Sequence, residues 1–406
     1  MDALDILMNK DQVIPYFEPV VSADKQTVIG YEVLSRIETE SGVKSLGGFF
    51  QDPSIPDEYR LEIDDHVQTL ALNYYIEKKT DQLLFLNYNV NLLMNDQGEE
   101  FIAKLLAYQE QGLRLDRVVL QIAEGLYIGD ISRLKHLLTY IQSLGMKVAL
   151  TDGGSGGRNL ERIAFLKPNI VKVNFSFLDG DNALPQLYRD ALHSLSMLTQ
   201  KIGALLLFDG INSFLDLNYA WRNGGRYYQG NYVAKPKREF VPHDLCKENL
   251  KEQFHHFINY ERKKIEAQLS ITDQLSKSIK STLKKVTVTD DYDDVVKRVA
   301  YELTDISFRV YICDHDGFQQ SSNAVRNEEG GWELHPEDRF KNWSWRPYFL
   351  ENIVRMNYEQ KGILSDLYTD IERDEIIRTY AIPIDDQLYL FIDIPYAYLF
   401  EKDGLL

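Results

Sequence analysis

The stretch IPYFEPVVSADKQTVIGYEVLS (residues 14–35) contains two runs of β-branched and aromatic residues, separated by the short segment ADKQ (23–26). Such runs are typical of β-strands. A connection this short cannot form a crossover, so the two strands are predicted to be antiparallel neighbours. Further runs of the same kind follow at 83–88, 118–123, 147–152, 169–175, 204–210 and 227–234.

Most of these runs are separated by segments in which apolar residues recur at helical spacing, as at Leu134, Leu137, Leu138 and Ile141. Strands that alternate with helices predict a modified TIM-like (β/α)8 barrel, here with one antiparallel strand. Functional residues of such barrels lie at the carboxyl ends of the strands. The polar residues predicted at those ends are Glu32, Asn87, Gln121, Glu124, Thr151, Asp152, Lys172, Asn174, Asp209 and Gln229.

The chain is predicted to have three parts: a barrel (1–243), a linker helix (244–286) and a small α/β domain (287–406). The middle part lacks Gly and Pro over 245–286 and has apolar residues at helical spacing, which predicts a long amphipathic helix with a break near Thr272. The last part contains short strand-like runs joined by turns, which favours an antiparallel sheet.

The composition excludes several classes of protein. The 406 residues carry a formal net charge of −17, which argues against non-specific binding to DNA. Two cysteines are too few for a disulfide framework. No apolar run is long enough to span a membrane, and the acidic start does not resemble a signal peptide. We therefore expect a cytoplasmic protein without a membrane span.

The segment GYEVLSR (30–36) resembles the GYEALLR signature of the EAL-domain family. That resemblance implies a barrel and the hydrolysis of cyclic di-GMP to the linear dinucleotide with Mg or Mn. The region after the barrel resembles that of family members in which a helix and a PAS- or Cache-like domain follow. Other segments resemble motifs of the family in the family's order: FEPVV (17–21), FLNYNVNLL (85–93), LQIAE (120–124), TDGGSG (151–156), KVNFSF (172–177), FDGIN (208–212) and YYQGNYVAKP (227–236).

The resemblance implies roles for individual residues. Glu32, Asn87, Asp152 and Gln229 match positions that surround the metal ions in the family. Lys172 matches a position that orients or activates water, and Asp209 stands at the other such position, where the family has a glutamate with a longer side chain. Glu124 matches a residue that braces the loop 153–157. Arg36 is a further candidate for contact with a phosphate, and the alternative for Lys172 is to neutralise Asp152 or Glu32.

Other positions depart from the family pattern. Gln121, Thr151 and Asn174 stand where the family has acidic metal ligands, and Glu18 stands where it has glutamine. Amides and hydroxyls are weak ligands for hard dications without companion carboxylates. Two-metal hydrolysis needs a cluster of carboxylates. These changes predict an impaired active site, and the charge of Glu18 is predicted to repel a phosphate.

A second candidate site lies in the last part of the chain. Trp345, Arg346 and Tyr368 are typical of a pocket in which an arginine and aromatic rings hold a small carboxylate. The alternative is that these residues form the core of a small domain.

The leading hypothesis is a catalytically inactive EAL-domain protein, a pseudoenzyme that acts as a signalling, regulatory or scaffolding module coupled to a sensor domain. One alternative is a weak metal-dependent cyclic di-GMP phosphodiesterase, and another is a cyclic di-GMP receptor without hydrolysis. No cofactor is expected, with Mg or Mn required only for residual phosphodiesterase activity. The family resemblance also implies a homodimer, whereas the sequence identifies no other protein partner.

Overall fold

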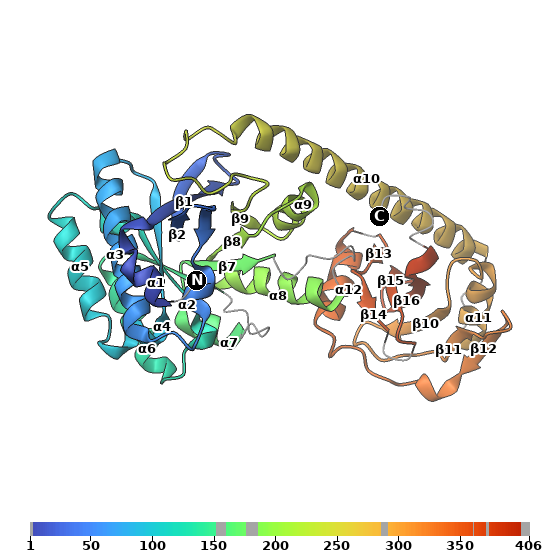
Figure 1. Cartoon of the computed structure of the whole chain (residues 1–406). Helices are drawn as coiled ribbons and strands as arrows, with labels where there is room; N and C mark the ends of the chain where they lie inside the picture. The colour runs from blue at the N-terminus through green and yellow to red at the C-terminus, as the bar shows by residue number, and fades with distance from the viewer. Residues whose placement is uncertain are drawn as a thin grey trace. The chain divides into compact units, whose positions relative to one another are not determined.

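The computed structural model of the chain describes residues 3–151, 160–175, 186–285, 291–359, 361–370 and 373–398. Asp152, which the family resemblance makes a metal ligand, lies outside these ranges. The chain divides into two compact units, Met1–His255 and His256–Leu406. In Figure 1 the first unit runs from blue to yellow and the second ends in red.

The first unit is built on a closed barrel. Its strands follow the order β1-β9-β8-β7-β6-β5-β4-β2, and β1 pairs with β2 to close the ring. Strand β1 is antiparallel to both neighbours, whereas the other strands of the ring are parallel, so the predicted barrel with one antiparallel strand is confirmed. The strands are β1 (Val13–Ser22), β2 (Val28–Thr39), β4 (Leu83–Tyr88), β5 (Val118–Ile122), β6 (Lys147–Thr151), β7 (Ile170–Asn174), β8 (Leu205–Asp209) and β9 (Gly225–Tyr228).

Helices connect the parallel strands of the barrel, as Figure 1 shows. A short exposed strand, β3 (Gly42–Ser45), extends the sheet beside β2 and was not predicted. The described helices of the barrel unit are α1 (Ala3–Met8), α2 (Gly47–Gln51), α3 (Asp57–Lys78), α4 (Val90–Asn95), α5 (Glu99–Gln109), α6 (Ile131–Ser143), α7 (Leu160–Leu166), α8 (Gln186–Ile202) and α9 (Phe214–Arg222).

Helix α10 (Lys247–Lys285) runs without interruption for 39 residues, so the predicted break near Thr272 is wrong. The hydroxyl of Thr272 donates a 2.8 Å hydrogen bond to the carbonyl of Gln268, which satisfies the side chain inside the helix. The first turns of α10 pack on the barrel unit, where the ring of Phe254 meets Tyr228 edge to face. Its later turns belong to the second unit.

The second unit is a small α/β domain. Its sheet has the order β12-β11-β10-β16-β15-β13, with β14 beside β15, and the pairings are antiparallel. The strands are β10 (Arg309–Asp314), β11 (Asn323–Arg326), β12 (Trp332–His335), β13 (Ile363–Leu364), β14 (Tyr368–Thr369), β15 (Ile376–Pro383) and β16 (Leu388–Pro395). The helices are α11 (Tyr292–Glu302) and α12 (Pro347–Glu359).

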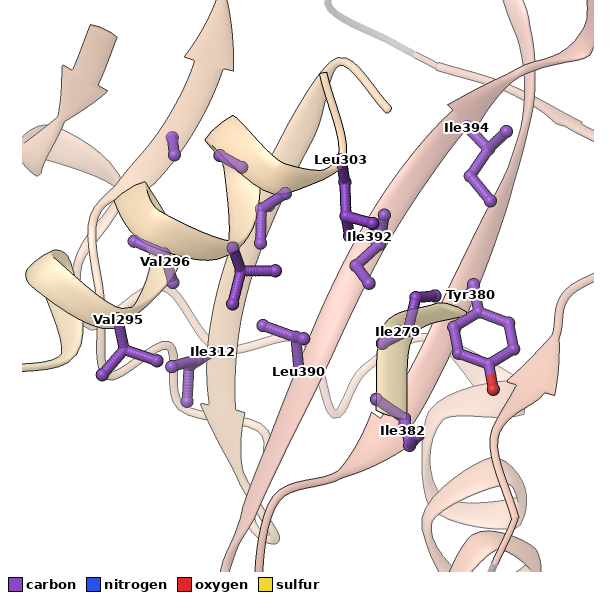
Figure 2. Close-up of a cluster of buried hydrophobic side chains, with 14 of the residues drawn as sticks. Ile279, Val295, Val296, Leu303, Ile312, Tyr380, Ile382, Leu390, Ile392 and Ile394 are labelled. Atoms are coloured by element: carbon purple, nitrogen blue, oxygen red, sulfur yellow. The ribbon is translucent and has the colours of Figure 1, made fainter. Parts of the chain in front are cut away.

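The core of this unit lies between the sheet, α11 and the end of α10. Figure 2 shows Ile279 of α10 and Val296 of α11 beside strand residues Leu390 and Ile392. Ile279, Val296 and both strand residues are completely buried. Burial of these side chains is the main force that holds α10 to the sheet. Among the helices that the structure describes, none is long and apolar enough to cross a membrane.

Candidate functional site

Two acidic residues face each other where β1 meets β2. The antiparallel register pairs Glu18 directly with Glu32. Side chains alternate between the two faces of a strand, so Tyr31, next to Glu32, points to the opposite face. The hydroxyl of Tyr31 donates a 2.9 Å hydrogen bond to the carbonyl of Val241, in the segment that leads to α10. This alternation leaves Glu18 and Glu32 together on the face where the other strand ends converge.

The carboxylate of Glu32 is surrounded by hydrogen-bond donors from four other strands. Its Oε1 accepts from Nδ2 of Asn87 at 2.8 Å and from Nε2 of Gln121 at 2.9 Å. Its Oε2 accepts from Nζ of Lys172 and from Nε2 of Gln229, each at 2.5 Å. Asn87 lies in β4, Gln121 in β5 and Lys172 in β7, and Gln229 directly follows β9. The structure therefore brings these five predicted residues into one cluster.

Lys172 holds two carboxylates at once. Its ammonium also lies 3.0 Å from Oδ2 of Asp209, while Oδ1 of Asp209 accepts a hydrogen bond from the backbone of Gly210. Burial lowers the pKa of Lys172, but Asp209 and Glu32 outweigh it and raise that pKa above its usual value. Burial likewise raises the pKa of Glu32, but Lys172 and the amide donors hold it below its usual value. The pair is therefore charged at neutral pH.

The pKa of Glu18 is shifted in the opposite direction from that of Glu32. Burial, together with the negative charges of Glu32 and Asp209, raises its pKa from 4.5 to about 8. The carboxyl is therefore mostly protonated at neutral pH. The repulsion of a phosphate that the sequence analysis predicted for Glu18 is correspondingly weak there.

The remaining residues predicted at the barrel mouth are placed less centrally. Thr151 and Asn174 end β6 and β7, and Asn174 lies in register with Asp209. Arg36 is four residues beyond Glu32 on β2, and its guanidinium donates to the carbonyl of Ser35 and the hydroxyl of Ser45. Glu124 is buried just after β5, and its carbonyl accepts a 2.8 Å bond from Arg162. The loop 153–157 that Glu124 was predicted to brace lies outside the described residues.

The candidate site in the second unit brings Arg346 close to aromatic rings. The guanidinium of Arg346 lies 4.6 Å from the ring centre of Trp343, 5.6 Å from Trp345 and 5.7 Å from Tyr368. Arg346 and Trp343 line a cavity of about 30 Å³, whereas Trp345 is 67% exposed and lies outside it. Such a volume accommodates water molecules, not an amino acid.

A buried ion cluster in the second unit was missed by the sequence analysis. The guanidinium of Arg309 pairs with Asp393 at 2.6 Å and with Asp370, and Asp393 also accepts from Thr379 at 2.6 Å. Thr379 in turn contacts the hydroxyl of Tyr368 at 2.6 Å. The available signal was an aspartate inside the otherwise apolar run LYLFIDI (388–394), because a buried carboxylate requires a partner.

The fold and the gathered motif residues define a barrel of the EAL type, and comparison with known proteins agrees. The EAL domain profile matches residues 1–236, and a profile described as an EAL-domain associated signalling protein domain, YkuI_C, matches residues 240–406. The chain therefore belongs to the EAL-domain family, in the group that carries this C-terminal domain.

The chain is similar over its full length to the EAL-domain containing protein YkuI of Bacillus subtilis, with 46% identity and complete coverage of both chains. The crystal structure of YkuI in complex with cyclic di-GMP and calcium superposes with a TM-score of 0.94, again over the whole of both chains. A probable cyclic di-GMP phosphodiesterase of Escherichia coli, PdeG, is 22% identical over 56% of this chain and 45% of its own length.

The family and the YkuI complex raise the question of a divalent metal at the barrel mouth. In the described part of the chain, no group of three or more His, Cys, Asp or Glu side chains could hold a metal ion. The carboxylates of Glu32 and Asp209 share the Lys172 ammonium. Among the residues that the structure describes, two buried amide oxygens, Oε1 of Gln121 and Oε1 of Gln229, have no hydrogen-bond partner. Two neutral oxygens do not replace the carboxylates that a pair of hard dications requires, so these residues do not fit a two-metal site.

Proposed function

We propose that this EAL-domain protein binds cyclic di-GMP at the barrel mouth without hydrolysing it at an appreciable rate, and that it acts as a regulatory module coupled to its C-terminal domain. The observation that carries this proposal is the saturation of Glu32 by four protein donors. A carboxylate with every lone pair engaged is poorly placed to bridge two metal ions.

Binding of the dinucleotide is supported by the similarity to YkuI and by the local charges. Cyclic di-GMP carries two phosphates, and guanidinium and ammonium groups are the side chains that recognise phosphate. Lys172 stands within the cluster, and Arg36 lies further along β2 on the same face of the strand as Glu32. Protonation of Glu18 at neutral pH removes one negative charge from this region.

Titration calorimetry with Arg36→Met and Arg238→Met tests this placement. Both substitutions remove one cation. Arg238, however, is a surface residue that pairs with Glu38, which lies on β2 like Arg36. We expect Arg36→Met to weaken binding of cyclic di-GMP by about tenfold or more, because it removes a charged hydrogen-bond donor. Arg238→Met should bind as the unsubstituted protein does. Absence of binding by the unsubstituted protein would refute the receptor function.

A weak metal-dependent phosphodiesterase is the second candidate. The observation that favours it is that Glu32, Asn87, Lys172, Asp209 and Gln229 meet at the barrel mouth, where the family carries out hydrolysis. Slow conversion of cyclic di-GMP that requires Mg or Mn and disappears in Glu32→Gln would establish this candidate.

For the second unit we propose a sensor role with a small carboxylate as ligand. Arg346 could pair with the carboxylate among the rings of Trp343 and Tyr368. A thermal-shift screen against amino acids and short carboxylic acids tests this role, and any stabilisation should be absent in Arg346→Ala. We also propose that the protein is a homodimer, which light scattering in solution tests directly.

A further inference from the structure

The amide nitrogen of Gln121 lies between two oxygen atoms of the barrel mouth. Nε2 of Gln121 is 2.9 Å from Oε1 of Glu32 and 2.8 Å from Oδ1 of Asn87. An amide nitrogen carries two protons, so it donates to both oxygens at once. Both oxygens belong to residues at positions that surround metal ions in the family. The nitrogen therefore links two oxygens that a cation would otherwise link.

We infer that Gln121 takes the place of a divalent cation at the barrel mouth, so that this chain binds cyclic di-GMP without a divalent cation. This inference rests on the proposed function, because it concerns the same site. The inference names Gln121 as the residue whose amide nitrogen makes a metal ion unnecessary at this site. Positive charge for the phosphates then comes from Arg36, further along β2, because the Lys172 ammonium is already shared by Glu32 and Asp209.

The orientation of the Gln121 amide follows from its neighbours. If the amide were turned over, its oxygen would face two other acceptors, the carboxylate of Glu32 and the oxygen of Asn87. The oxygen of Asn87 is oriented in turn, because the nitrogen of that amide donates to Glu32 at 2.8 Å. The observed arrangement therefore gives both protons of the Gln121 nitrogen an acceptor, and among the described residues it leaves Oε1 of that amide without a donor.

Gln121 has little freedom to move aside for a metal. It lies in β5, is 3% exposed, and is held between β4 and β6, in register with Asn87 and Ala149. A cation between Glu32 and Asn87 would have to displace the Nε2 atom and leave both its protons without acceptors. Unsatisfied buried donors are costly, so the protein's own donor is favoured over an ion here.

The substitution Gln121→Glu tests the inference because it replaces the donor nitrogen with an oxygen. Carboxylate and amide oxygens would then converge at one point, as calcium prefers. Calorimetric titration with calcium alone should show no binding to the unsubstituted protein at submillimolar concentrations. For Gln121→Glu we expect the affinity for calcium to rise by about tenfold or more. The control is Gln82→Glu, which makes the same change of charge. Gln82 lies just before β4, whereas Asn87 lies near the other end of that strand.

A second experiment measures cyclic di-GMP binding to the unsubstituted protein, once in EDTA and once in millimolar calcium. Because it uses only the unsubstituted protein, its result does not depend on whether a variant folds. Equal affinity in the two buffers is expected. Submillimolar binding of calcium alone, or an increase of about tenfold in dinucleotide affinity on adding calcium, would overturn the inference. If the dinucleotide binds in neither buffer, the proposed function fails, while the calcium titrations still decide whether Gln121 replaces a cation.

Discussion

Lys172 and Glu32 lie on different strands of the barrel, β7 and β2, and meet with Nζ 2.5 Å from Oε2. Both side chains are almost completely buried, at 5% and 6% exposure. The ammonium therefore satisfies a charge that water cannot reach. This pair shows how the barrel mouth balances its charges with protein groups.

Replacement of Lys172 by methionine should destabilise the barrel. It leaves Glu32 and Asp209 buried without their shared cation, which costs about 3–5 kcal/mol in comparable buried pairs. Urea unfolding followed by circular dichroism measures the loss. Lys10→Met is the matched control, since Lys10 pairs with Glu62 on the surface and its removal should cost less than about 1 kcal/mol. Equal losses of unfolding free energy for the two variants would show that the buried pair contributes no more to stability than the surface pair.

The raised pKa of Glu18 predicts a dependence of stability on pH. The unfolded carboxyl loses its proton near 4.5 and the folded one near 8. Between these pH values the folded state therefore binds more protons than the unfolded state. The protonated Glu18 carboxyl contributes its full share of the unfolding free energy below pH 4.5, and this contribution is lost as the pH rises through 8.

Glu18→Gln removes this dependence, because the amide cannot titrate. Relative to the unsubstituted protein, the variant should gain on the order of 4 kcal/mol in unfolding free energy between about pH 5 and about pH 9. Asp64, whose pKa burial raises to about 7, titrates in both proteins and cancels in the difference. Parallel stability profiles for the two proteins would argue against a buried, protonated Glu18.

The ion cluster around Arg309 predicts a sensitive position in the second unit. Arg309→Met removes the cation that pairs with the buried carboxylates of Asp370 and Asp393, and should destabilise this unit by about 3–5 kcal/mol. Trp332, Trp343 and Trp345 lie in this unit, so tryptophan fluorescence during unfolding reports mainly on it. The surface control Arg298→Met breaks an exposed helical pair with Asp294 and should cost less than about 0.5 kcal/mol. A similar cost for both would contradict this view of the cluster.

Helix α10 offers a matched pair of apolar residues. Ile279 is completely buried in the core of the second unit, whereas Ile265 is 55% exposed on the same helix. Ile279→Ala should destabilise the unit by about 2–5 kcal/mol through lost burial and the cavity left behind. Ile265→Ala makes the same chemical change and should cost less than about 1 kcal/mol. Thermal unfolding compares the two variants, and an equal shift would show that α10 does not contribute to this core.

Much of the barrel could be predicted from the sequence, because its strands are apolar runs with polar ends. The run LLFLNY (83–88) coincides with β4, and the short ADKQ connection correctly predicted an antiparallel first pair. Strands β3 and β12 were missed because each has only four residues and mostly lacks burial. The break predicted near Thr272 is absent from α10, because a threonine hydroxyl can bond back to a carbonyl of its own helix.

The residues of the candidate site could be predicted from the sequence, but the hydrogen bonds among their side chains could not. Glu32, Asn87, Gln121 and Gln229 lie in or directly after strands of one barrel, so their convergence follows from topology. The donation from Gln121 to both Glu32 and Asn87 depends on side-chain torsions that no spacing reveals. Lys172 was expected beside Asp152 or Glu32, and its bond to Asp209 emerged only from the distances.

The most direct test of the central claim is a single-turnover experiment. The protein, in excess over cyclic di-GMP and in the presence of Mg or Mn, is incubated and sampled by chromatography for the linear dinucleotide. Our account predicts that the nucleotide is bound, as equilibrium dialysis of the same mixture would show, and stays cyclic. Conversion to the linear product that disappears in Glu32→Gln would contradict it.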